Sequence, residues 1–497
     1  MKAKPIKKIV VVGGGTSGWM SAAMLAKSFE KTMEIELIES DAISTVGVGE
    51  ATIPPIRSFN GYLGIDEMDF LKATKGSIKL AIEFQNWGQK GDSYLHGFGY
   101  VGRKIGITPF HVYWQKCLKE GKAKDLSSYS FNNIAAQANK FAPVTKIKNT
   151  PLDGLSWAFH FDAGLYAKFL RHYSEDKGVV RTEGKIVAVH QDSESGCVTS
   201  VELENGTKIE ADLFIDCSGF RALLINGALN SGYEDWSKWL PCDRAYAVPC
   251  SNDNSPYRPY TQSIAHSAGW QWRIPLQHRT GNGHVYASAF MTDETAAEIL
   301  MNNLEGEALK DPMQLKFTAG KRSKIWDKNV ISIGLASGFI EPLESTSIHL
   351  VQMGITNLVM HFPSSQDCSL NARDYNNRMD FEYERIRDFI ILHYHVTERD
   401  DSEFWNYVRT MDVPHSLQQR IESFKHNGFV YREDNELFTG EGWLQVMVGQ
   451  GIIPNYHNPI ADQVTVEESA EYLQNLNVIM ERAAQQLPTH KQFLNSL

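Results

Sequence analysis

A glycine-rich turn between two apolar strands constrains the fold of this chain more than any other feature. Residues 9–12 form a short apolar run typical of a buried parallel strand, and the sequence GGGTSG follows at 13–18. A helix is predicted from Trp19 to about Phe29, and a second strand, EIELIES, begins at Glu34. The order strand, glycine turn, helix, strand predicts a β-α-β unit within an α/β fold.

The spacing inside this unit indicates a dinucleotide site. Gly13, Gly15 and Gly18 stand at GxGxxG spacing, and Glu39 ends the second strand, 39 − 18 = 21 residues after the last glycine. Glycines permit a tight turn and close approach of a pyrophosphate, whose charge the helix N-terminus stabilises, while the acid binds ribose hydroxyls. The same turn places Thr16 and Ser17 among the predicted cofactor-binding residues.

Two later segments indicate that the cofactor is FAD. Residues 184–219 alternate strands with an SESG turn and an NG turn, which predicts an antiparallel meander. Such a meander inserted in a Rossmann-type fold resembles the large FAD-dependent oxidoreductases of the hydroxylase type. Near residue 330, NVISIGLASGFIEPLEST reads as another buried strand, a glycine turn and a helix. No second GxGxxG that opens a helical run is visible, so reduced flavin is expected from elsewhere, although some hydroxylases bind nicotinamide without that motif.

These segments divide the chain into a discontinuous core, 1–365, and a mostly helical C-terminal region, 366–497. Within the core we expect flavin segments at about 1–60, 150–225 and 325–365, with substrate-side segments at about 60–150 and 225–325. Thr465 to Glu468 is a capping box that predicts the start of a final helix.

Bulk composition excludes several classes of protein. The 497 residues are 42% apolar and 22% charged, with a net charge of 49 − 59 = −10, which argues against nucleic-acid or anionic-membrane partners. No apolar stretch is long enough for a signal peptide or a membrane span, so we expect a cytoplasmic protein. Six scattered cysteines without a CxxC motif predict reduced thiols, and the LHYH stretch at 392–395 has the wrong helical spacing for a metal site.

The stretch GWQWRIP at 269–275 is an unusual concentration of aromatic bulk. On a strand, Trp270, Trp272 and Ile274 share one face, and Pro275 ends the run. A buried sheet core would explain these residues as well as a functional wall would.

Four segments together resemble the flavin-dependent tryptophan halogenases over most of the chain. They are GGGTSGW at 13–19, GVGEATIP at 47–54, GWQWRIP at 269–275 and GLASGFIEPLEST at 334–346. The WxWxIP pattern is the most specific of them, because ordinary flavin monooxygenases lack it. The resemblance implies that Trp270, Trp272, Ile274 and Pro275 keep organic substrate away from the flavin. It also implies reduced FAD (FADH2) from a separate NAD(P)H-dependent flavin reductase, with oxygen and a halide ion as co-substrates.

The resemblance also assigns catalytic roles. Hypohalous acid would travel to Lys79 in GSIKLAIEF, a residue that would otherwise be read as a solvated surface lysine. Its ammonium would polarise hypohalous acid by a hydrogen bond or form a haloamine, and the sequence leaves both open. Glu344 would stabilise the cationic arene intermediate and take its proton, although it would also suit a helix cap. Ser345 would link the flavin side to the Lys79 side.

Further site residues follow from the same likeness. The backbone amides of Thr346 and Ser347 would hold halide; tryptophan-specific members usually have glycine at the second position, which leaves chloride and bromide open, with bromide expected for an indole-type member. His96 and Phe98 would sandwich the aromatic substrate, although a surface role for His96 stays open. Additional cofactor contacts are expected at Gly49, Glu50, Ala51, Ile186, Leu335 and Ile348.

The substrate side departs from the tryptophan enzymes. The C-terminal stretch ELFTGEGWLQVMVGQGIIPNYHN does not align with their tyrosine pair or amino-acid clamp, and Trp443 within it is as consistent with a core residue. We therefore expect a small electron-rich arene of the indole type. An FAD-dependent aromatic hydroxylase and a non-catalytic flavin-binding module are the alternatives, since a fold does not fix a function. The sequence leaves a carrier-bound substrate and a homo-oligomer open.

Overall fold

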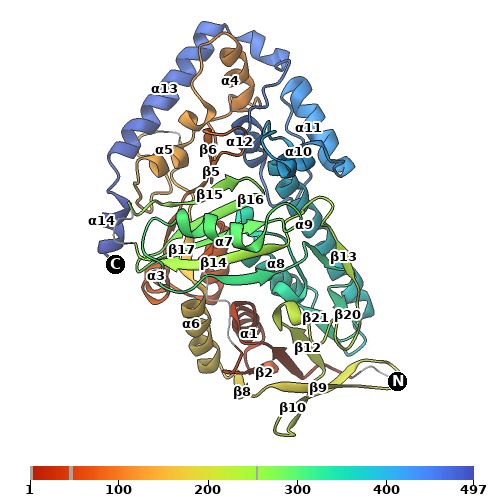
Figure 1. Cartoon of the computed structure of the whole chain (residues 1–497). Helices are drawn as coiled ribbons and strands as arrows, with labels where there is room; N and C mark the ends of the chain where they lie inside the picture. The colour runs from red at the N-terminus through yellow and green to blue at the C-terminus, as the bar shows by residue number, and fades with distance from the viewer. Residues whose placement is uncertain (1–3, 44–48, 151, 253–255) are drawn as a thin grey trace. The chain divides into compact units, whose positions relative to one another are not determined.

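The chain forms two compact units, each assembled from three stretches of sequence. The computed structural model describes residues 4–43, 49–150, 152–252 and 256–497. The first unit comprises Met1–Gly76, Phe161–Asp243 and Lys316–Glu384, and the second comprises Ser77–His160, Arg244–Leu315 and Arg385–Leu497. Figure 1 shows the chain coloured by residue number.

A six-stranded sheet is the centre of the first unit. Its strands, in order, are β20 (Trp326–Asp327), β21 (Val330–Ser332), β12 (Leu213–Asp216), β1 (Lys8–Val12), β2 (Glu34–Glu39) and β8 (Val180–Glu183). All neighbouring pairs are parallel except β20 and β21. The expected α/β architecture with a parallel Rossmann-type sheet is therefore confirmed.

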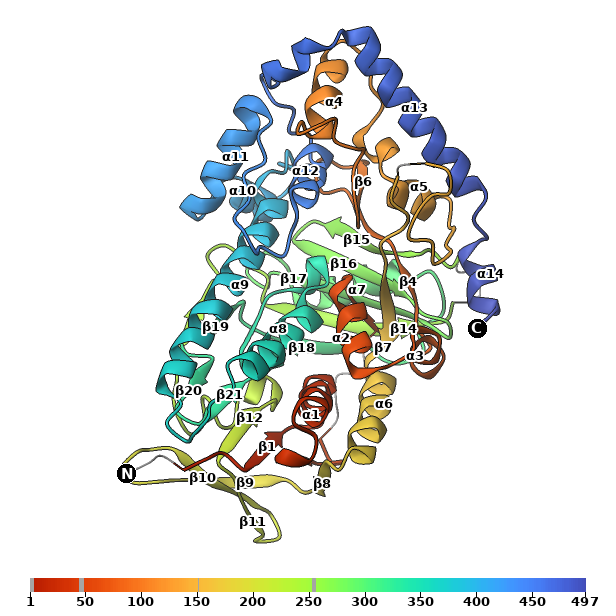
Figure 2. The same ribbon diagram turned by 180° about the vertical axis from the view of Figure 1, so that it is seen from behind.

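Helices pack around this sheet. Those of the first unit are α1 (Thr16–Phe29), α2 (Pro55–Leu63), α3 (Glu67–Thr74), α6 (Ala163–Asp176), α8 (Ser347–Met360) and the first part of α9 (Ser369–His395). Helix α1 contacts both α6 and α8 (Figure 2). It begins at Thr16, three residues before the predicted start at Trp19, because Gly15 in the turn itself is the N-cap. The apolar periodicity that supported the prediction begins only after that first turn.

The predicted meander is present beside the sheet. Strands β9 (Ile186–Gln191), β10 (Val198–Leu203) and β11 (Lys208–Glu210) pair antiparallel, and their apolar side chains share a core with Val10 and Ile38 of the parallel sheet. The first unit also contains β3 (Gly49–Ala51) and a small sheet of β13 (Tyr233–Asp235), β19 (Gly320–Arg322) and β22 (Gly338–Phe339).

A seven-stranded sheet organises the second unit. Its order is β18 (Met313–Lys316), β14 (Arg244–Cys250), β17 (Thr280–Tyr286), β16 (Gly269–Pro275), β15 (Tyr260–His266), β5 (Ala81–Gln85) and β6 (Ser93–Gly97). Next to it, β4 (Ser77–Lys79) pairs antiparallel with β7 (Ala158–Asp162). Strand β16, which is GWQWRIP, lies in the middle of this sheet, and all seven of its residues are buried. Gln271 and Arg273 are therefore enclosed as well as the two tryptophans.

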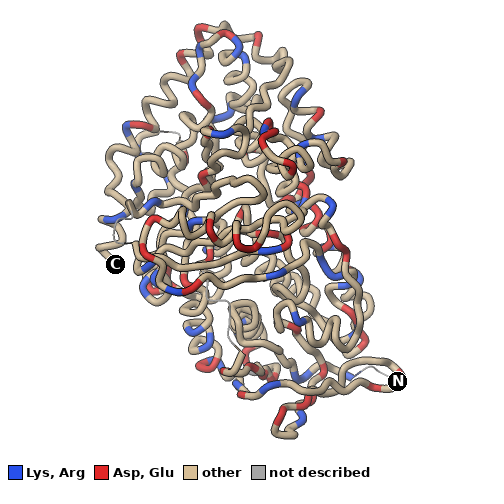
Figure 3. Tube along the Cα trace, viewed as in Figure 1, with Lys and Arg blue, Asp and Glu red and all other residues tan. Residues whose placement is uncertain are grey.

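The C-terminal region is mostly helical, as predicted. Helices of the second unit are α4 (Phe110–Lys119), α5 (Phe131–Gln137), α7 (Asp293–Asn302), α10 (Glu403–Thr410), α11 (His415–Asn427), α12 (Gly440–Gly449), α13 (Val466–Gln485) and α14 (His490–Asn495). The capping box at Thr465 and Glu468 is confirmed at the start of α13. Among the described residues, no helix is long and apolar enough to cross a membrane. Lys and Arg are interspersed with Asp and Glu along the chain (Figure 3).

Candidate active site

The carboxyl ends of three parallel strands meet at one edge of the first unit. The backbone N–H of Gly13 donates to Ile38 (2.8 Å), that of Cys217 to Val12 (2.8 Å) and that of Ile333 to Asp216 (3.0 Å). These bonds hold the turns after β1, β12 and β21 beside one another. In open α/β sheets, ligands bind at this edge.

Two glycines of the GxGxxG turn are required by close backbone approach. A Cβ on Gly13, whose φ is +113°, would stand 2.4 Å from the carbonyl oxygen of Cys217. A Cβ on Gly18 would stand 1.8 Å from the carbonyl oxygen of Gly13. Because both obstacles are backbone atoms, no side-chain adjustment relieves them. The turn is thereby kept as bare backbone at the N-terminus of α1, whose first turn contains no acidic residue.

Glu39 lies where a ribose-binding acid is expected. Its carboxylate accepts hydrogen bonds from the indole N–H of Trp19 (3.3 Å) and from the guanidinium of Arg181, and it reaches over Gly14, where a Cβ would stand 1.5 Å from it. Arg181 comes from β8, 142 residues away in sequence. The bare turn and the oriented acid fit the pyrophosphate and ribose of a dinucleotide.

Other predicted cofactor residues gather around this turn. The hydroxyl of Thr16 donates to the carbonyl of Ala163 (3.3 Å). Ser17 lies against Gly334, which has a φ of +74° and whose Cβ would come within 2.8 Å of the serine side chain. Leu335, which follows Gly334, is half-buried, and Ile348 in the first turn of α8 is buried. Ile186 packs on the hydrophobic core of the meander, which a purely structural role would also explain.

The segment at 49–51 contains a titratable group with a shifted pKa. Gly49, Glu50 and Ala51 form β3, whereas Gly47 and Val48 of the same motif lie outside the described residues. Burial raises the pKa of Glu50 to about 7. Loss of solvation disfavours the charged carboxylate, so the protonated form persists toward neutral pH in the folded chain.

We expect Glu50→Gln to stabilise the protein at high pH only. The folded chain holds this proton up to about pH 7, whereas an unfolded glutamate loses it near 4.5. Folding is therefore weakened as pH rises from 4.5 to 7, and the loss is complete above 7. At pH 8 the variant should gain about 3 kcal/mol in the free energy of unfolding, with almost no gain at pH 4.5. Urea unfolding without added flavin measures this. Glu30→Gln, at an exposed site, is the control; equal shifts for both variants would contradict the expectation.

A strained turn precedes α8. Pro342–Glu344 form a short 3₁₀ helix, Ser345 follows with a φ of 59°, and Thr346 is the N-cap of α8. Glu344, Ser345 and Thr346 are buried, whereas Ser347 is half-buried. A non-glycine residue at positive φ is costly and recurs at functional sites. In the described part of the chain, the hydroxyl of Thr346 has no hydrogen-bond partner, and Thr346 rather than Glu344 is at the cap position.

Lys79 and the predicted aromatic residues lie in the second unit. Lys79 ends β4 and is fully buried, with its ammonium 5.4 Å from the centre of the Phe98 ring. The backbone N–H of Phe98 donates to Leu80 (3.0 Å), which fixes this pairing. His96 is buried on β6, with its ring 5.7 Å from that of Phe389 and 6.4 Å from that of Phe438. The solvated-surface interpretation of Lys79 and the surface alternative for His96 are therefore wrong.

Trp443 belongs to the aromatic core around His96. It is 1% exposed, its ring centre is 4.7 Å from that of Phe389, and the guanidinium of Arg420 lies 4.0 Å above it. Arg420 pairs with buried Glu436 at 2.6 Å. The core alternative for Trp443 is thus supported, and its indole N–H has no partner among the described residues.

The two tryptophans of β16 are backed by further aromatic residues. Trp270 and Trp272 have ring centres 6.2 Å apart, and Trp87 lies 6.5 Å from Trp270 and 5.7 Å from Trp405. Gly283 on β17 faces Trp272, and a Cβ there would stand 2.0 Å from the indole. The neighbouring residues therefore leave no room for the two indoles to pack differently.

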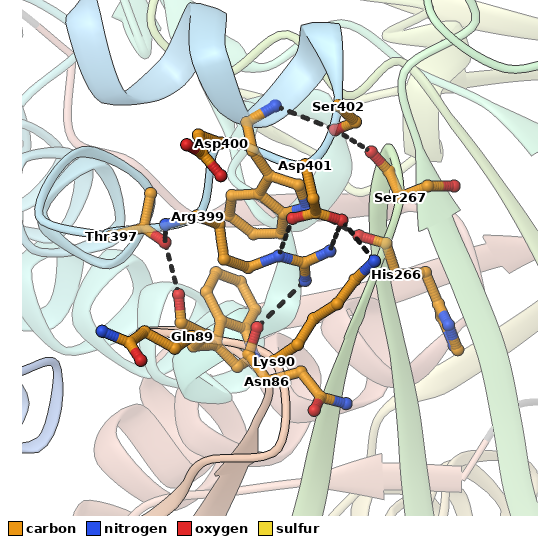
Figure 4. A network of polar contacts seen from close by, with 12 residues as sticks. Asn86, Gln89, Lys90, His266, Ser267, Thr397, Arg399, Asp400, Asp401 and Ser402 are labelled. Carbon is orange, nitrogen blue, oxygen red and sulfur yellow. Dashed lines mark hydrogen bonds and ion pairs between the residues drawn. The ribbon is translucent and has the colours of Figure 1, made fainter.

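Polar contacts fix the turn that leads into β16 (Figure 4). Ser402 donates to the carbonyl of Ser267 (2.6 Å), and the indole N–H of Trp405 donates to the carbonyl of His266 (2.7 Å). Arg399 lies 4.4 Å from the Trp405 ring and donates twice to Asp401, at 2.8 and 3.1 Å. The wall is consequently anchored at the end where its strand begins.

The two histidines near the end of α9 are used for hydrogen bonds to backbone carbonyls. His393 and His395 hydrogen-bond to the carbonyls of Phe389 and Val408 respectively, and no group of three or more His, Cys, Asp or Glu side chains in the described ranges could hold a metal. The six cysteines are not joined to one another by disulfide bonds in the described part of the chain.

Several residues of these sites were not predicted from the sequence. Arg181 holds Glu39, and Ser77 and His160 adjoin the strand of Lys79. Ser77 was discoverable, because a residue two positions from Lys79 on a strand shares its face. The other two have no signal in the sequence, since their partners are distant along the chain.

Comparison with known proteins identifies the family. A sequence profile described as tryptophan halogenase matches residues 8–466. The chain belongs to the tryptophan halogenase family. This halogenase is 33% identical to tryptophan 7-halogenase RebH of Lentzea aerocolonigenes, with 91% of each chain covered. It is 32% identical to tryptophan 6-halogenase ThaL of Streptomyces albogriseolus, with 92% of this chain and 91% of that protein covered.

Solved structures agree with this assignment. The halogenase superposes on Xcc4156, a flavin-dependent halogenase from Xanthomonas campestris, with a TM-score of 0.95 and 44% identity over 99% of this chain and 98% of that one. It superposes on BrvH, a flavin-dependent halogenase from Brevundimonas sp. BAL3, with a TM-score of 0.96 and 41% identity over 99% and 100%. The protein is therefore an enzyme of the flavin-dependent halogenase class, and a flavin is its cofactor.

Proposed function

We propose that this enzyme uses reduced FAD, oxygen and chloride or bromide to halogenate a small electron-rich arene such as an indole. The observation that carries the proposal is the complete burial of Lys79 beside Phe98, in a chain that also has the WxWxIP wall. A fully buried lysine is rare unless it has a partner or a task. Family membership disfavours the hydroxylase and the non-catalytic module.

The first unit would hold the cofactor. The turn at Gly13, Gly15 and Gly18 suits the pyrophosphate, with Glu39 oriented for a ribose. When bound, reduced FAD would supply two electrons, so that oxygen, halide and a proton give hypohalous acid and water. The separate NAD(P)H-dependent reductase is inferred because no second GxGxxG opens a helix in the described residues: the same spacing at Gly97, Gly99 and Gly102 follows β6, and the next helix, α4, begins only at Phe110.

The turn before α8 would hold the halide. Its position at a helix N-terminus favours an anion, and the buried hydroxyl of Thr346, which has no partner among the described residues, adds a donor to the backbone amides of Thr346 and Ser347. Because amides provide the site, serine in place of glycine at 347 would retain it.

Lys79 would direct hypohalous acid to the arene. Its ammonium donates a hydrogen bond to the oxygen and makes the halogen more electrophilic, and the ring C–H is exchanged for C–halogen with water as the second product. Glu344 would stabilise the positive charge on the ring and accept its proton. Ser345 would connect the two sides.

The arene would stack on His96 and Phe98. Phe389 and Phe438 lie beside His96, and Trp443 packs on Phe389, so the surroundings of His96 are aromatic and suit a flat neutral ring. The relatives RebH and ThaL are named as tryptophan halogenases. The C-terminal stretch of this chain does not align with the clamp that holds the amino and carboxylate groups in the tryptophan enzymes, so an indole without a zwitterionic side chain is proposed here.

The test is turnover measured by mass spectrometry. The reaction contains the enzyme, FAD, NADH, a separate flavin reductase, indole, and chloride or bromide. A product with the halogen isotope pattern that requires the reductase would support the proposal, and the two halides would rank by product yield. A hydroxylated product, or NADPH consumption by the enzyme alone, would favour the hydroxylase. Tight and regioselective turnover of free tryptophan would overturn the proposed substrate class.

A further inference from the structure

A buried chain of hydrogen bonds connects the strand of Lys79 to the end of the tryptophan wall. The hydroxyl of Ser77 bonds to the carbonyl of Pro275 and lies 3.0 Å from Nδ1 of His160. Nε2 of His160 lies 2.9 Å from the hydroxyl of Thr261. Ser77, His160 and Thr261 are at most 5% exposed. Each member therefore depends on the others for its hydrogen bonds.

Donor and acceptor requirements determine which group donates in each of these hydrogen bonds. The carbonyl of Pro275 only accepts, so the Ser77 hydroxyl donates to it and accepts a bond from Nδ1–H of His160. A neutral imidazole then presents a bare Nε2, which accepts from the Thr261 hydroxyl. All four groups are satisfied in one arrangement.

The charge state of His160 agrees with this arrangement. Burial lowers the pKa of His160 well below its ordinary value, and the nearby Lys79 and His490 act in the same direction. The imidazole is consequently neutral and adds no positive charge beside the ammonium of Lys79.

This hydrogen-bond network lies on the same face of β4 as the side chain of Lys79. Ser77 and Lys79 are two residues apart on β4, so their side chains share a face, and Ser77 pairs directly with His160 across β4 and β7. The backbone N–H groups on either side of Lys79 are also hydrogen-bonded. The N–H of Ile78 donates to Nε2 of His490 (3.1 Å), and that of Leu80 donates to the carbonyl of Pro259 (2.7 Å). Side-chain and backbone contacts therefore fix this strand on both sides of Lys79.

We propose that Ser77, His160 and Thr261 are positioning residues that hold the ammonium of Lys79 in register with the tryptophan wall. The inference rests on the proposed function of Lys79 and adds a cause for its orientation. Their loss should leave halide oxidation intact and reduce delivery of the halogen to the arene, because a misplaced catalytic group costs rate without preventing earlier steps.

The experiment separates these two steps in the full-length enzyme with FAD, reductase, bromide and indole. Bromoindole reports delivery, and a soluble 1,3-diketone reports hypobromous acid that escapes. We expect Ser77→Ala to lower bromoindole formation by about tenfold to a hundredfold and to raise the trapped fraction correspondingly. Total bromide oxidation and the KM for indole should stay within about twofold, in keeping with a defect confined to the later step. Thr261→Val should act in the same direction, and Thr261→Ser, which keeps the hydroxyl, should restore the wild-type ratio.

A control substitutes a buried residue of the same unit that takes no part in the hydrogen bonds of Ser77, His160 and Thr261. His284 on β17 is fully buried and bonds to the carbonyl of Ala296 (3.0 Å). His284→Gln should reduce thermal stability without changing the ratio of bromoindole to trapped bromine. A merely structural role for Ser77 would make both variants alike, with delivery and oxidation falling together, and would overturn the inference. Hydroxylated indole from Ser77→Ala would also overturn it, because the wall rather than Lys79 would have moved.

A crystal structure of Ser77→Ala gives a readout that does not depend on activity. The ammonium of Lys79 should move by about 1 Å relative to β16, the scale of misplacement that matters for catalysis. An unmoved ammonium would overturn the inference whatever the assay shows. If wild-type enzyme gives neither bromoindole nor trapped bromine, the proposed function fails instead. If wild type succeeds and only the Ser77→Ala ratio is unchanged, the positioning role alone fails.

Discussion

Replacing Lys79 by methionine is expected to lower halogenated product by at least about a hundredfold while the protein keeps its fold and its flavin. Groups that supply or polarise a reacting atom commonly contribute 10²–10⁴-fold to rate. Methionine matches the volume of the lysine stem in this fully buried position but has no ammonium to donate. Product is measured by mass spectrometry, flavin binding by fluorescence, and folding by the thermal transition.

The control for this prediction is another buried lysine of the second unit. Lys116 on α4 is 8% exposed, and its ammonium donates to the carbonyls of Ala461 (2.9 Å) and Val464 (2.6 Å). Lys116→Met removes one donor from the Ala461 carbonyl, which keeps the N–H of Val464 (3.3 Å), and the donor that the Val464 carbonyl has from Lys116. It should cost about 1–3 kcal/mol of stability, with product formation by the folded fraction unchanged. Substantial turnover by Lys79→Met at equal flavin occupancy would remove Lys79 from the catalytic role.

Gly18→Ala is expected to abolish measurable flavin binding. The added Cβ would stand 1.8 Å from the carbonyl oxygen of Gly13, which is backbone and cannot rotate away. The turn after β1 must then open, and the pyrophosphate loses the amides of the turn and the start of α1. A loss of at least about a hundredfold in FAD affinity, or about 3 kcal/mol, is expected by titration of the flavin spectrum.

Gly61→Ala is the matched substitution in the same unit. Gly61 lies within α2, and an added Cβ there would meet nothing within 4 Å. Alanine should leave flavin binding unchanged and add about 0.5–1 kcal/mol of stability, because glycine is unfavourable in a helix interior. Equal effects of the two substitutions on flavin affinity would show that the turn does not form the pyrophosphate site.

Features governed by neighbours along the chain were predictable from the sequence. The apolar run at 9–12, the glycine spacing and the second strand predict the β-α-β unit, and the residues at 465–468 predict a capped helix. Alternation places Trp270 and Trp272 on one face of a strand. Each of these depends on φ/ψ preferences and hydrogen bonds within a few residues, which local sequence specifies.

Helix boundaries and contacts between residues far apart in the chain were harder to predict from the sequence. The start of α1 was missed by three residues, because a turn that follows a bare glycine lacks the apolar periodicity used to detect helices. Residue type alone does not predict that His96 and Lys79 are buried. Their burial depends on elements such as β7 and α12, which come long after them in the sequence.

The sequence by itself determined the parallel β-α-β unit, the bare glycine turn and the motifs that mark a flavin-dependent halogenase. Only the tertiary structure brought Arg181 to Glu39 across 142 residues and His160 to Ser77 across 83. Such pairs form because packing of buried strands leaves each polar group one satisfiable arrangement, and an unmade bond in the interior is costly. Local spacing specifies the chemistry that is available, whereas long-range packing decides which side chains hold it in place.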